Sequence, residues 1–204
     1  MKGVSRRKVA TRTAYEVVLI VCEGLTEVTY FDNYKSKLKT FGIEVKAISD
    51  EHNDPIGIVK DAIKKLKEEK AEHTWCVFDR DHHTQHQLNQ AKQLAEKNKI
   101  HIAFSNPCFE IWLLLHFKYS SAPYRNYDEL EKALKQIPEL SSYQKETCYF
   151  NKLLPLWQTA VKNSKKLILE HKTSGNSQYS VNSNPSTSIH EVVEFLHHKQ
   201  SSST

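Results

Sequence analysis

The sequence lacks several features that would place it in a special class of protein. Its apolar runs fall well short of the roughly 20 residues that cross a membrane, so we expect no membrane segment and no signal peptide. The four cysteines form no CxxC pair, which predicts reduced, mostly buried thiols rather than disulfides or a zinc site. A hydrophobic content of 39% and a charged content of 26% are ordinary for a globular protein. We therefore expect a cytoplasmic protein with no membrane partner.

A strong excess of positive charge is also absent. The net charge is +5, which permits a polyanionic partner without requiring one. Arg6, Arg7 and Arg12 cluster near the N-terminus, whereas the later lysines are mixed with glutamates. This basic cluster is either a nucleic-acid contact or a solvated tail, and the sequence leaves both open.

Apolar runs alternate with amphipathic stretches over the first half of the chain. Strands are expected at 17–22, 43–48, 73–78 and 100–104, with helices between them. Strands that alternate with helices pair in parallel through right-handed crossovers. The sequence therefore predicts an α/β protein with a parallel sheet of about four strands and flanking helices.

The second half of the chain has mainly helical patterns. An apolar helix is expected in SNPCFEIWLLLHF, followed by helices from about Tyr127, over roughly 150–171 and from about Thr187. We expect a basic N-terminal arm at 1–16, an α/β core at 17–118 and a helical C-terminal extension at 119–200 that packs on the core.

Acidic residues follow two of the expected strands. Glycine is scarce, with five in the chain, yet Gly24 directly follows Glu23 at the end of the apolar run VVLIVC. Asp79 and Asp81 follow the third strand, and if the extended conformation persists they face the same way. Three carboxylates at one edge of a sheet repel one another unless a cation neutralises them, which favours Mg²⁺ or Mn²⁺. Taken singly, each acid is also explained by the start of a helix.

Further candidates stand near these acids. Glu110 lies on the apolar helix, and it is either another ligand or base, or a salt-bridged or partly exposed acid near a helix start. Asn106 is a candidate cap of the same helix. Trp112 is expected in the core. His82, His83 and His86 follow the DRD motif and are candidates for a base or for transition-metal ligands, with His82 and His86 spaced i, i+4. Hard carboxylates favour Mg²⁺, however, and exposed loop histidines are common.

Lysines on the expected helix over 150–171 are candidates for phosphate binding. Lys152, Lys165 and Lys166 each have the charge to neutralise a phosphate. Solvated lysines on a helix surface explain the same residues, and the sequence does not select one of them.

Four motifs together resemble a known family. EGLTE at 23–27 and DRD at 79–81 resemble the two signatures of a Toprim domain, the metal-dependent module of topoisomerases, primases and certain nucleases. The EGxTE form is similar to that of OLD-family nucleases. With SNPCFEIWLLLHF and SNPSTSIHEVVEFL added, the chain resembles the RloB-like family from about Val17 to Leu196. Such proteins resemble Toprim domains and are often encoded beside an ATPase partner in bacterial restriction or phage-defence loci.

The resemblance implies roles for the matching residues. It makes Glu23 a metal ligand or a general acid/base, and it makes Asp79 and Asp81 metal ligands. Glu27 matches the second acid of the OLD-like motif and would join a second metal. Gly24 matches the glycine that lets a phosphate-bearing strand approach the backbone.

The resemblance also implies a function. This chain carries none of the additional domains of topoisomerases or primases, so hydrolysis is expected rather than strand passage or primer synthesis. The expected function is a Mg²⁺-dependent nuclease, or a nuclease subunit, that cleaves nucleic-acid phosphodiesters in anti-phage defence. The alternative is a non-catalytic subunit that binds a nucleotide or nucleic acid within a defence complex containing an ATPase.

Overall fold

The computed structural model describes residues 15–39, 41–49 and 54–202. Arg6, Arg7 and Arg12, on which the predicted nucleic-acid contact depends, lie outside these residues. The described part of the chain contains a five-stranded sheet in the order β2-β1-β3-β4-β5. The strands are β1 (Glu16–Cys22), β2 (Ile43–Ser49), β3 (His73–Asp79), β4 (His101–Asn106) and β5 (Ser186–Thr187).

The sheet confirms the predicted α/β class. The four expected strands pair in parallel, and the short β5 adds an antiparallel edge to β4. The α-helices of the described residues are α1 (Leu25–Lys39), α2 (Pro55–Glu68), α3 (Gln85–Lys97), α4 (Glu110–Phe117), α5 (Tyr127–Lys135), α6 (Phe150–Leu153), α7 (Trp157–Thr173) and α8 (Ile189–Ser202).

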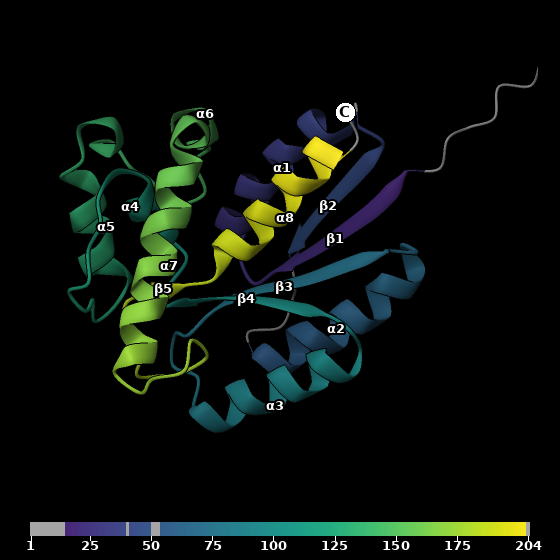
Figure 1. The fold of residues 1–204 in the computed structure, drawn as a ribbon, viewed down its shortest axis with the longest axis horizontal. Helices are drawn as coiled ribbons and strands as arrows, with labels where there is room; N and C mark the ends of the chain where they lie inside the picture. The colour runs from purple at the N-terminus through teal and green to yellow at the C-terminus, as the bar shows by residue number, and fades with distance from the viewer. Residues whose placement is uncertain (1–14, 40, 50–53, 203–204) are drawn as a thin grey trace, which may run out of the picture.

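The central strand β1 shows why the sheet has helices on both faces. Its residues from Val18 to Cys22 are fully buried, as expected of a parallel strand with a continuous apolar sequence. Val18 and Ile20 pack into the hydrophobic core under α1 and α8, whereas Leu19 and Val21 pack into the core under α2 and α3. Successive side chains of a strand point to opposite faces, and Figure 1 shows these two helix pairs on the two sides of the sheet.

The second half of the chain is helical at first and then returns to the sheet. In Figure 1, α4, α5, α6 and α7 are grouped near the carboxyl ends of the strands, and α8 lies beside α1. The expected single helix over 150–171 is wrong in one respect. A 3₁₀ turn at Leu154–Leu156 separates α6 from α7, because Pro155 has no backbone N–H for a continuous helix. The predicted domain boundaries stay predictions.

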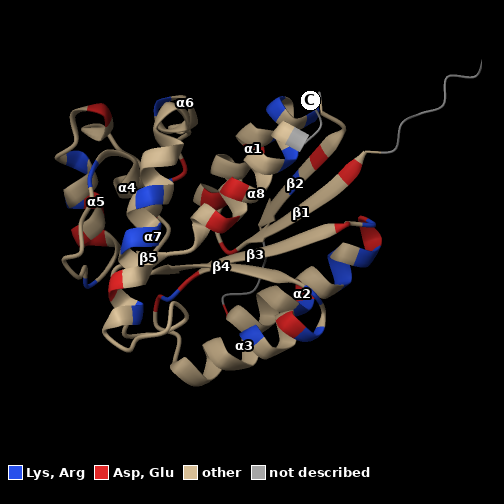
Figure 2. Ribbon diagram, viewed as in Figure 1, with Lys and Arg blue, Asp and Glu red and all other residues tan. Residues whose placement is uncertain are grey.

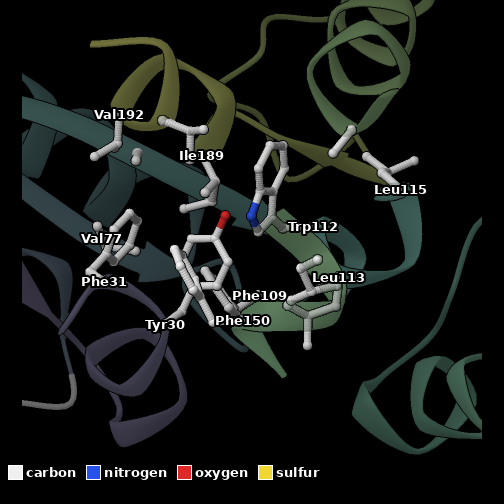
Figure 3. Packing of buried hydrophobic residues seen from close by; sticks show 14 of the residues in the cluster. Tyr30, Phe31, Val77, Phe109, Trp112, Leu113, Leu115, Phe150, Ile189 and Val192 are labelled. Atoms are coloured by element: carbon white, nitrogen blue, oxygen red, sulfur yellow. The ribbon is translucent and has the colours of Figure 1, made fainter. Parts of the chain in front are cut away.

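Aromatic residues anchor the start of α4 in the core. The ring of Tyr30 lies 5.6 Å from Phe109, 6.5 Å from Trp112 and 5.7 Å from Phe150, centroid to centroid. Figure 3 shows these four rings packed together. The predicted core position of Trp112 is thereby confirmed, since its side chain is fully buried. This packing fixes the segment that precedes and begins α4.

Charged residues are interspersed on the outer helices. Figure 2 shows both basic and acidic positions on α2 and α3, where Lys65 pairs with Asp61 and Lys92 lies 3.8 Å from Glu96. Within the described residues, no helix combines the length and the apolar character that crossing a membrane requires.

Candidate metal centre

The carboxyl ends of β1 and β3 bring Glu23 and Asp79 together. These strands are parallel neighbours, so they end at the same edge of the sheet. The backbone N–H of Glu23 donates to the carbonyl of Val77 at 2.9 Å, which continues the pairing past the end of β1. In return, the backbone N–H of Asp79 donates to Oε2 of Glu23 at 2.8 Å. The predicted meeting of these two acids is therefore present.

The segment after β4 adds two further side chains to this edge. The backbone N–H of Arg80 donates to the carbonyl of Ser105 at 2.7 Å, which holds the end of β3 against β4. The chain then passes Pro107, and Cys108 and Glu110 reach Asp79. One ligand atom from each of Asp79, Cys108 and Glu110 lies within 4.8 Å of the others. Two carboxylates and a thiol thus converge on one point.

The carboxylate of Asp79 lacks a partner for one of its oxygens. Its Oδ1 is buried and has no hydrogen-bond partner among the described residues. Burial raises the pKa of Asp79 well above its usual range, and the charges of Glu27, Glu23 and Glu110 raise it further. A buried, unsatisfied carboxylate oxygen is costly, and a cation beside it removes the cost. The residues present therefore fit a bound metal ion.

Glu27 lies in the first turn of α1 and is also buried. Its side chain is 4% exposed. Burial raises the pKa of Glu27 to about 8, with the charges of Glu110 and Glu23 adding to the shift and a hydrogen bond to its own backbone opposing it. Glu27 therefore belongs to the same group of mutually repelling acids.

Gly24 makes room for Glu27. A Cβ built on Gly24 would lie 2.9 Å from Oε2 of Glu27, which is closer than real Cβ contacts. The positive φ angles of the described glycines are at Gly42 and Gly175 and not at Gly24. Space for a neighbouring carboxylate, rather than a left-handed turn, thus explains this glycine. Its predicted contact with a phosphate-bearing strand stays a prediction.

Asp81 does not share the environment of Asp79. Strand β3 ends at Asp79, and Asp81 has a left-handed φ of 41° in an exposed turn. The extended conformation that would point both side chains the same way therefore does not continue. Asp81 still lies close enough to raise the pKa of Asp79. Its role as a metal ligand stays a prediction.

A hydrogen bond from Tyr143 holds the carboxylate of Glu110 in place. It is 1% exposed, and the hydroxyl of Tyr143 donates to its Oε1 at 3.0 Å. Burial raises the pKa of Tyr143, and Glu110 raises it further, so this hydroxyl keeps its proton and remains a donor.

The interpretation of Asn106 as a helix cap is wrong. Its side-chain amide donates to the carbonyl of Ser180 at 3.1 Å, and α4 has no side-chain cap among the described residues.

Lys145 is the cation that sequence reasoning missed. Desolvation lowers its pKa, but the charges of Glu110, Asp79 and Glu27 outweigh this and raise the pKa of Lys145 overall. Its ammonium lies 5.0 Å from the ring centroid of Tyr127. In the sequence, Lys145 stands in a polar stretch between helices with no motif around it, so no pattern distinguishes it from other surface lysines.

The lysines proposed from the sequence have other partners. Lys152 donates to the carbonyl of Glu139 at 2.6 Å, and Lys165 pairs with Glu194 at 2.6 Å. Lys166 lies 3.9 Å from the ring centroid of Tyr119. Their predicted contact with nucleic acid stays a prediction.

Of the three histidines after β3, His83 lies beside an acid of the centre. Its Nε2 is 3.9 Å from Oε1 of Glu23, and burial lowers the pKa of His83 although Asp81 opposes the shift. His82 and His86 are exposed. The arrangement favours the interpretation of His82 and His86 as surface residues.

A family model decides the relationship of this chain to known proteins. The model described as RloB-like protein matches residues 18–196. The chain belongs to the RloB-like protein family. Comparisons with curated proteins and with solved structures found no match. The RloB-like match runs from within β1 to within α8 and includes every side chain of the centre.

The RloB-like centre has the donor set of a cation site. Asp79, Glu110 and Cys108 supply two hard oxygens and one sulfur, and Glu23 and Glu27 add negative charge around them. Buried charges of one sign bind a cation more strongly than exposed ones, because water screens them less. Lys145 balances part of this charge from the protein itself.

Proposed function

We propose that this RloB-like protein is a metal-dependent nuclease, or the nuclease subunit of a complex, that cleaves nucleic-acid phosphodiesters in prokaryotic anti-phage defence. The observation that carries the proposal is the buried, unpartnered Oδ1 of Asp79 among neighbouring carboxylates. Such a site is poor for stability and suited to a divalent cation such as Mg²⁺ or Mn²⁺.

Asp79 and Glu110 would hold the metal directly. When bound, a divalent ion would lower the pKa of a water molecule and stabilise charge on a phosphoryl oxygen. Tyr143 fixes the orientation of Glu110 through its hydrogen bond, and the backbone of Asp79 fixes Oε2 of Glu23. These contacts set the positions of the ligands before a metal arrives, which is what precise coordination needs.

Glu23 is assigned the proton transfer. Its Oε1 faces His83 at 3.9 Å, so the carboxylate has a neighbour to which a proton can pass. We propose that Glu23 takes the proton of the attacking water and that His83 assists its release to solvent. Glu27 and Asp81 are assigned to a second ion on the substrate side, with Gly24 keeping space for the carboxylate of Glu27.

Lys145 is assigned to the substrate phosphate. Metal neutralisation of the carboxylates would reduce the attraction that now holds this ammonium toward them. The freed cation would then contact a phosphate beside the centre. Arg6, Arg7, Arg12, Lys152 and Lys165 are proposed to contact the nucleic acid, and an ATPase partner is proposed to control access.

A second function is favoured by the burial of the centre. Glu110 is 1% and Cys108 6% exposed, so a phosphodiester reaches them only if neighbouring segments move. This observation favours a non-catalytic subunit that binds a nucleotide or nucleic acid, with the acids serving to hold a structural ion.

One experiment separates the two functions. The purified protein is incubated with labelled DNA and RNA in Mg²⁺, Mn²⁺ or EDTA, alongside Asp79→Asn and the matched control Asp128→Asn, which changes an exposed acid on α5. The nuclease proposal expects metal-dependent cleavage by the wild type and the control, and none by Asp79→Asn. Equal cleavage by all three proteins would reject the site, whereas nucleic-acid binding without cleavage would favour the binding subunit.

A further inference from the structure

We infer that Cys108 is a metal ligand, and that its sulfur makes this centre prefer divalent transition metals over Mg²⁺ and Ca²⁺. The inference rests on the proposed function only in taking the centre to hold a divalent ion. It concerns the identity of the ion and not the reaction. The chemistry of the preferred ion is that of the Mn²⁺ to Zn²⁺ series, in which affinity rises from Mn²⁺ to Cu²⁺ and falls again at Zn²⁺.

The position of the thiol supports this assignment. The ligand atoms of Asp79, Cys108 and Glu110 lie within 4.8 Å of one another. At a tetrahedral ion, bonds of about 2.3 Å to sulfur and about 2.1 Å to oxygen put two ligand atoms about 3.6 Å apart. The three atoms therefore share an ion if they move toward one another by up to about 1 Å.

The surroundings of Cys108 differ from those of an ordinary buried cysteine. Cys22 and Cys76 are fully buried on the strands β1 and β3, among apolar residues. Cys108 is buried too, but it faces two carboxylates. A thiol among apolar side chains is a packing residue, whereas a thiol beside Asp79 and Glu110 completes a donor set.

An independent observation points to a ligand at this place. The Oδ1 of Asp79 is buried and finds no hydrogen-bond donor within the described residues. By contrast, Oε1 of Glu110 receives the hydroxyl of Tyr143. Asp79, which carries the oxygen without a donor, is one of the three residues that converge, so an ion bound between them satisfies Asp79 and contacts Cys108 together.

The sulfur is also held in place. Phe109, the next residue, packs its ring 5.6 Å from Tyr30 and 6.5 Å from Phe31. On the other side of Cys108 in the sequence, the carbonyl of Pro107 accepts the N–H of Asp81 at 3.4 Å. A fixed ligand selects among ions by its chemistry, because it cannot move away from an unsuitable one.

Sulfur decides the selectivity because Mg²⁺ and transition metals differ in their affinity for it. Mg²⁺ demands oxygen ligands and retains water, whereas Co²⁺ and Zn²⁺ bind thiolate strongly. Coordination replaces the S–H bond of Cys108 by a metal–sulfur bond, and the proton leaves to solvent. The competing arrangement is a thiol that keeps its proton and hydrogen-bonds Glu110, with the metal bound by oxygen alone.

The test is metal binding by the metal-free full chain. Co²⁺ is titrated and followed by the sulfur-to-cobalt charge-transfer absorption, and Co²⁺ and Mg²⁺ affinities are measured by calorimetry. We compare the wild type with Cys108→Ser and with Cys148→Ser, which changes an exposed cysteine. Cys108→Asp tests an all-oxygen centre, and circular dichroism verifies that each variant is folded.

The expected result is specific to Cys108. The wild type and Cys148→Ser show the charge-transfer band, whereas Cys108→Ser loses it and binds Co²⁺ about 10-fold or more weakly. Its affinity for Mg²⁺ changes little, and Cys108→Asp gains affinity for Mg²⁺. If Cys108→Ser does not fold, the band and the Co²⁺ preference of the wild type still decide the question. Co²⁺ bound by the wild type without the band, or a band that Cys108→Ser keeps, would overturn the inference.

Failure of this inference is distinguishable from failure of the nuclease proposal. The absorption band and the affinities are read without any nucleic acid. A band without cleavage on any substrate rejects the nuclease and supports Cys108 as a ligand. Cleavage that depends on Asp79 and Mg²⁺, in a protein whose bound Co²⁺ gives no band, supports the nuclease and overturns the role of Cys108.

Discussion

The backbone N–H of Asp79 donates a 2.8 Å hydrogen bond to Oε2 of Glu23. The bond joins the main chain of Asp79 to the side chain of Glu23, although the two carboxylates repel each other. The bond sets the direction of the Glu23 carboxylate at the junction of β1 and β3. Because it uses the backbone of Asp79, both oxygens of the Asp79 side chain remain for other partners.

The first prediction follows from this bond. In Glu23→Gln, the side-chain carbonyl still accepts the N–H of Asp79, so the fold is kept, while one negative charge is lost. We expect the free energy of unfolding of the metal-free protein to stay equal or to rise, because repulsion at the centre falls. Metal-dependent cleavage is expected to fall by about 10²–10⁴-fold, the usual contribution of a general base.

Denaturant unfolding and cleavage assays test this prediction, and metal affinity separates the two roles of Glu23. Affinity close to wild type with reduced cleavage indicates a general base, and a large loss of affinity indicates a ligand. Glu23→Ala serves as the comparison, since it also removes the acceptor of the Asp79 N–H. Unchanged cleavage by Glu23→Gln would remove Glu23 from the mechanism.

The second prediction concerns Gly24 and Glu27. In Gly24→Ala, the new methyl group would lie 2.9 Å from Oε2 of Glu27 and would push this carboxylate away. We expect a loss of about 1–3 kcal/mol of stability, as for overpacking, and weaker metal binding. A double-mutant cycle with Glu27→Ala checks the cause, because the shorter side chain removes the contact. The prediction fails if Gly24→Ala costs as much stability in the Glu27→Ala background.

The third prediction is a pH dependence that arises away from the centre. His116 is buried on α4, and its Nδ1 lies 2.9 Å from the carbonyl of Trp112. Burial lowers the pKa of His116 to about 4, against hydrogen bonds to the backbone that raise it. In the unfolded chain, His116 therefore becomes protonated below about pH 6.5, whereas in the folded chain it becomes protonated only near pH 4. Stability from this residue is present above pH 6.5 and is lost as the pH falls toward 4.

His116→Leu isolates this contribution. The variant removes the titration, and we expect its free energy of unfolding to exceed that of the wild type increasingly as the pH falls from 6.5 to 4, by at most about 3 kcal/mol. The comparison is made as a difference, because the buried acids Asp79 and Glu27 have raised pKa values and contribute with the opposite sign. His86→Gln, at an exposed position, is the control. Parallel pH curves for His116→Leu and the wild type would contradict the prediction.

The sheet could be predicted because its strands carry strong local signals. The uninterrupted apolar run of β1 is typical of a central parallel strand, and β1 lies between β2 and β3 as this implies. Details at the element ends were less predictable. Helix α1, for example, begins at Leu25, in the middle of the EGLTE motif. The two-residue β5 has no local pattern and depends on its pairing with β4.

Contacts within the centre were predictable only where the order and direction of the strands bring the residues together. Glu23 and Asp79 meet because strands that run in parallel end at one edge, which follows from the topology. Cys108 and Lys145 depend on how the chain travels after β4 and before α6, which no local pattern encodes. The left-handed backbone conformation of Asp81 is rare for a residue other than glycine. The alternation of side chains along a strand therefore predicted the wrong direction for the Asp81 side chain.

The last prediction distinguishes Lys145 from the lysines that the sequence favoured. Lys145 is attracted by Glu110, Asp79 and Glu27, whereas Lys165 is paired with Glu194 on α8. In Lys145→Gln, the metal-free centre loses a compensating cation, so we expect lower stability without metal and little change when the metal is bound. The same substitution should weaken nucleic-acid binding and cleavage, because a phosphate loses its cation.

Lys165→Gln provides the matched control for charge. Both variants lower the net charge of the protein by one, so a general electrostatic effect on nucleic-acid binding would be equal in the two. Thermal unfolding with and without metal, and cleavage rates at several salt concentrations, are measured for both. A clearly larger loss of cleavage in Lys145→Gln than in Lys165→Gln places the Lys145 ammonium at the substrate phosphate. Equal losses in the two variants would instead assign Lys145 to the general basic surface, since screening by salt then acts on both alike.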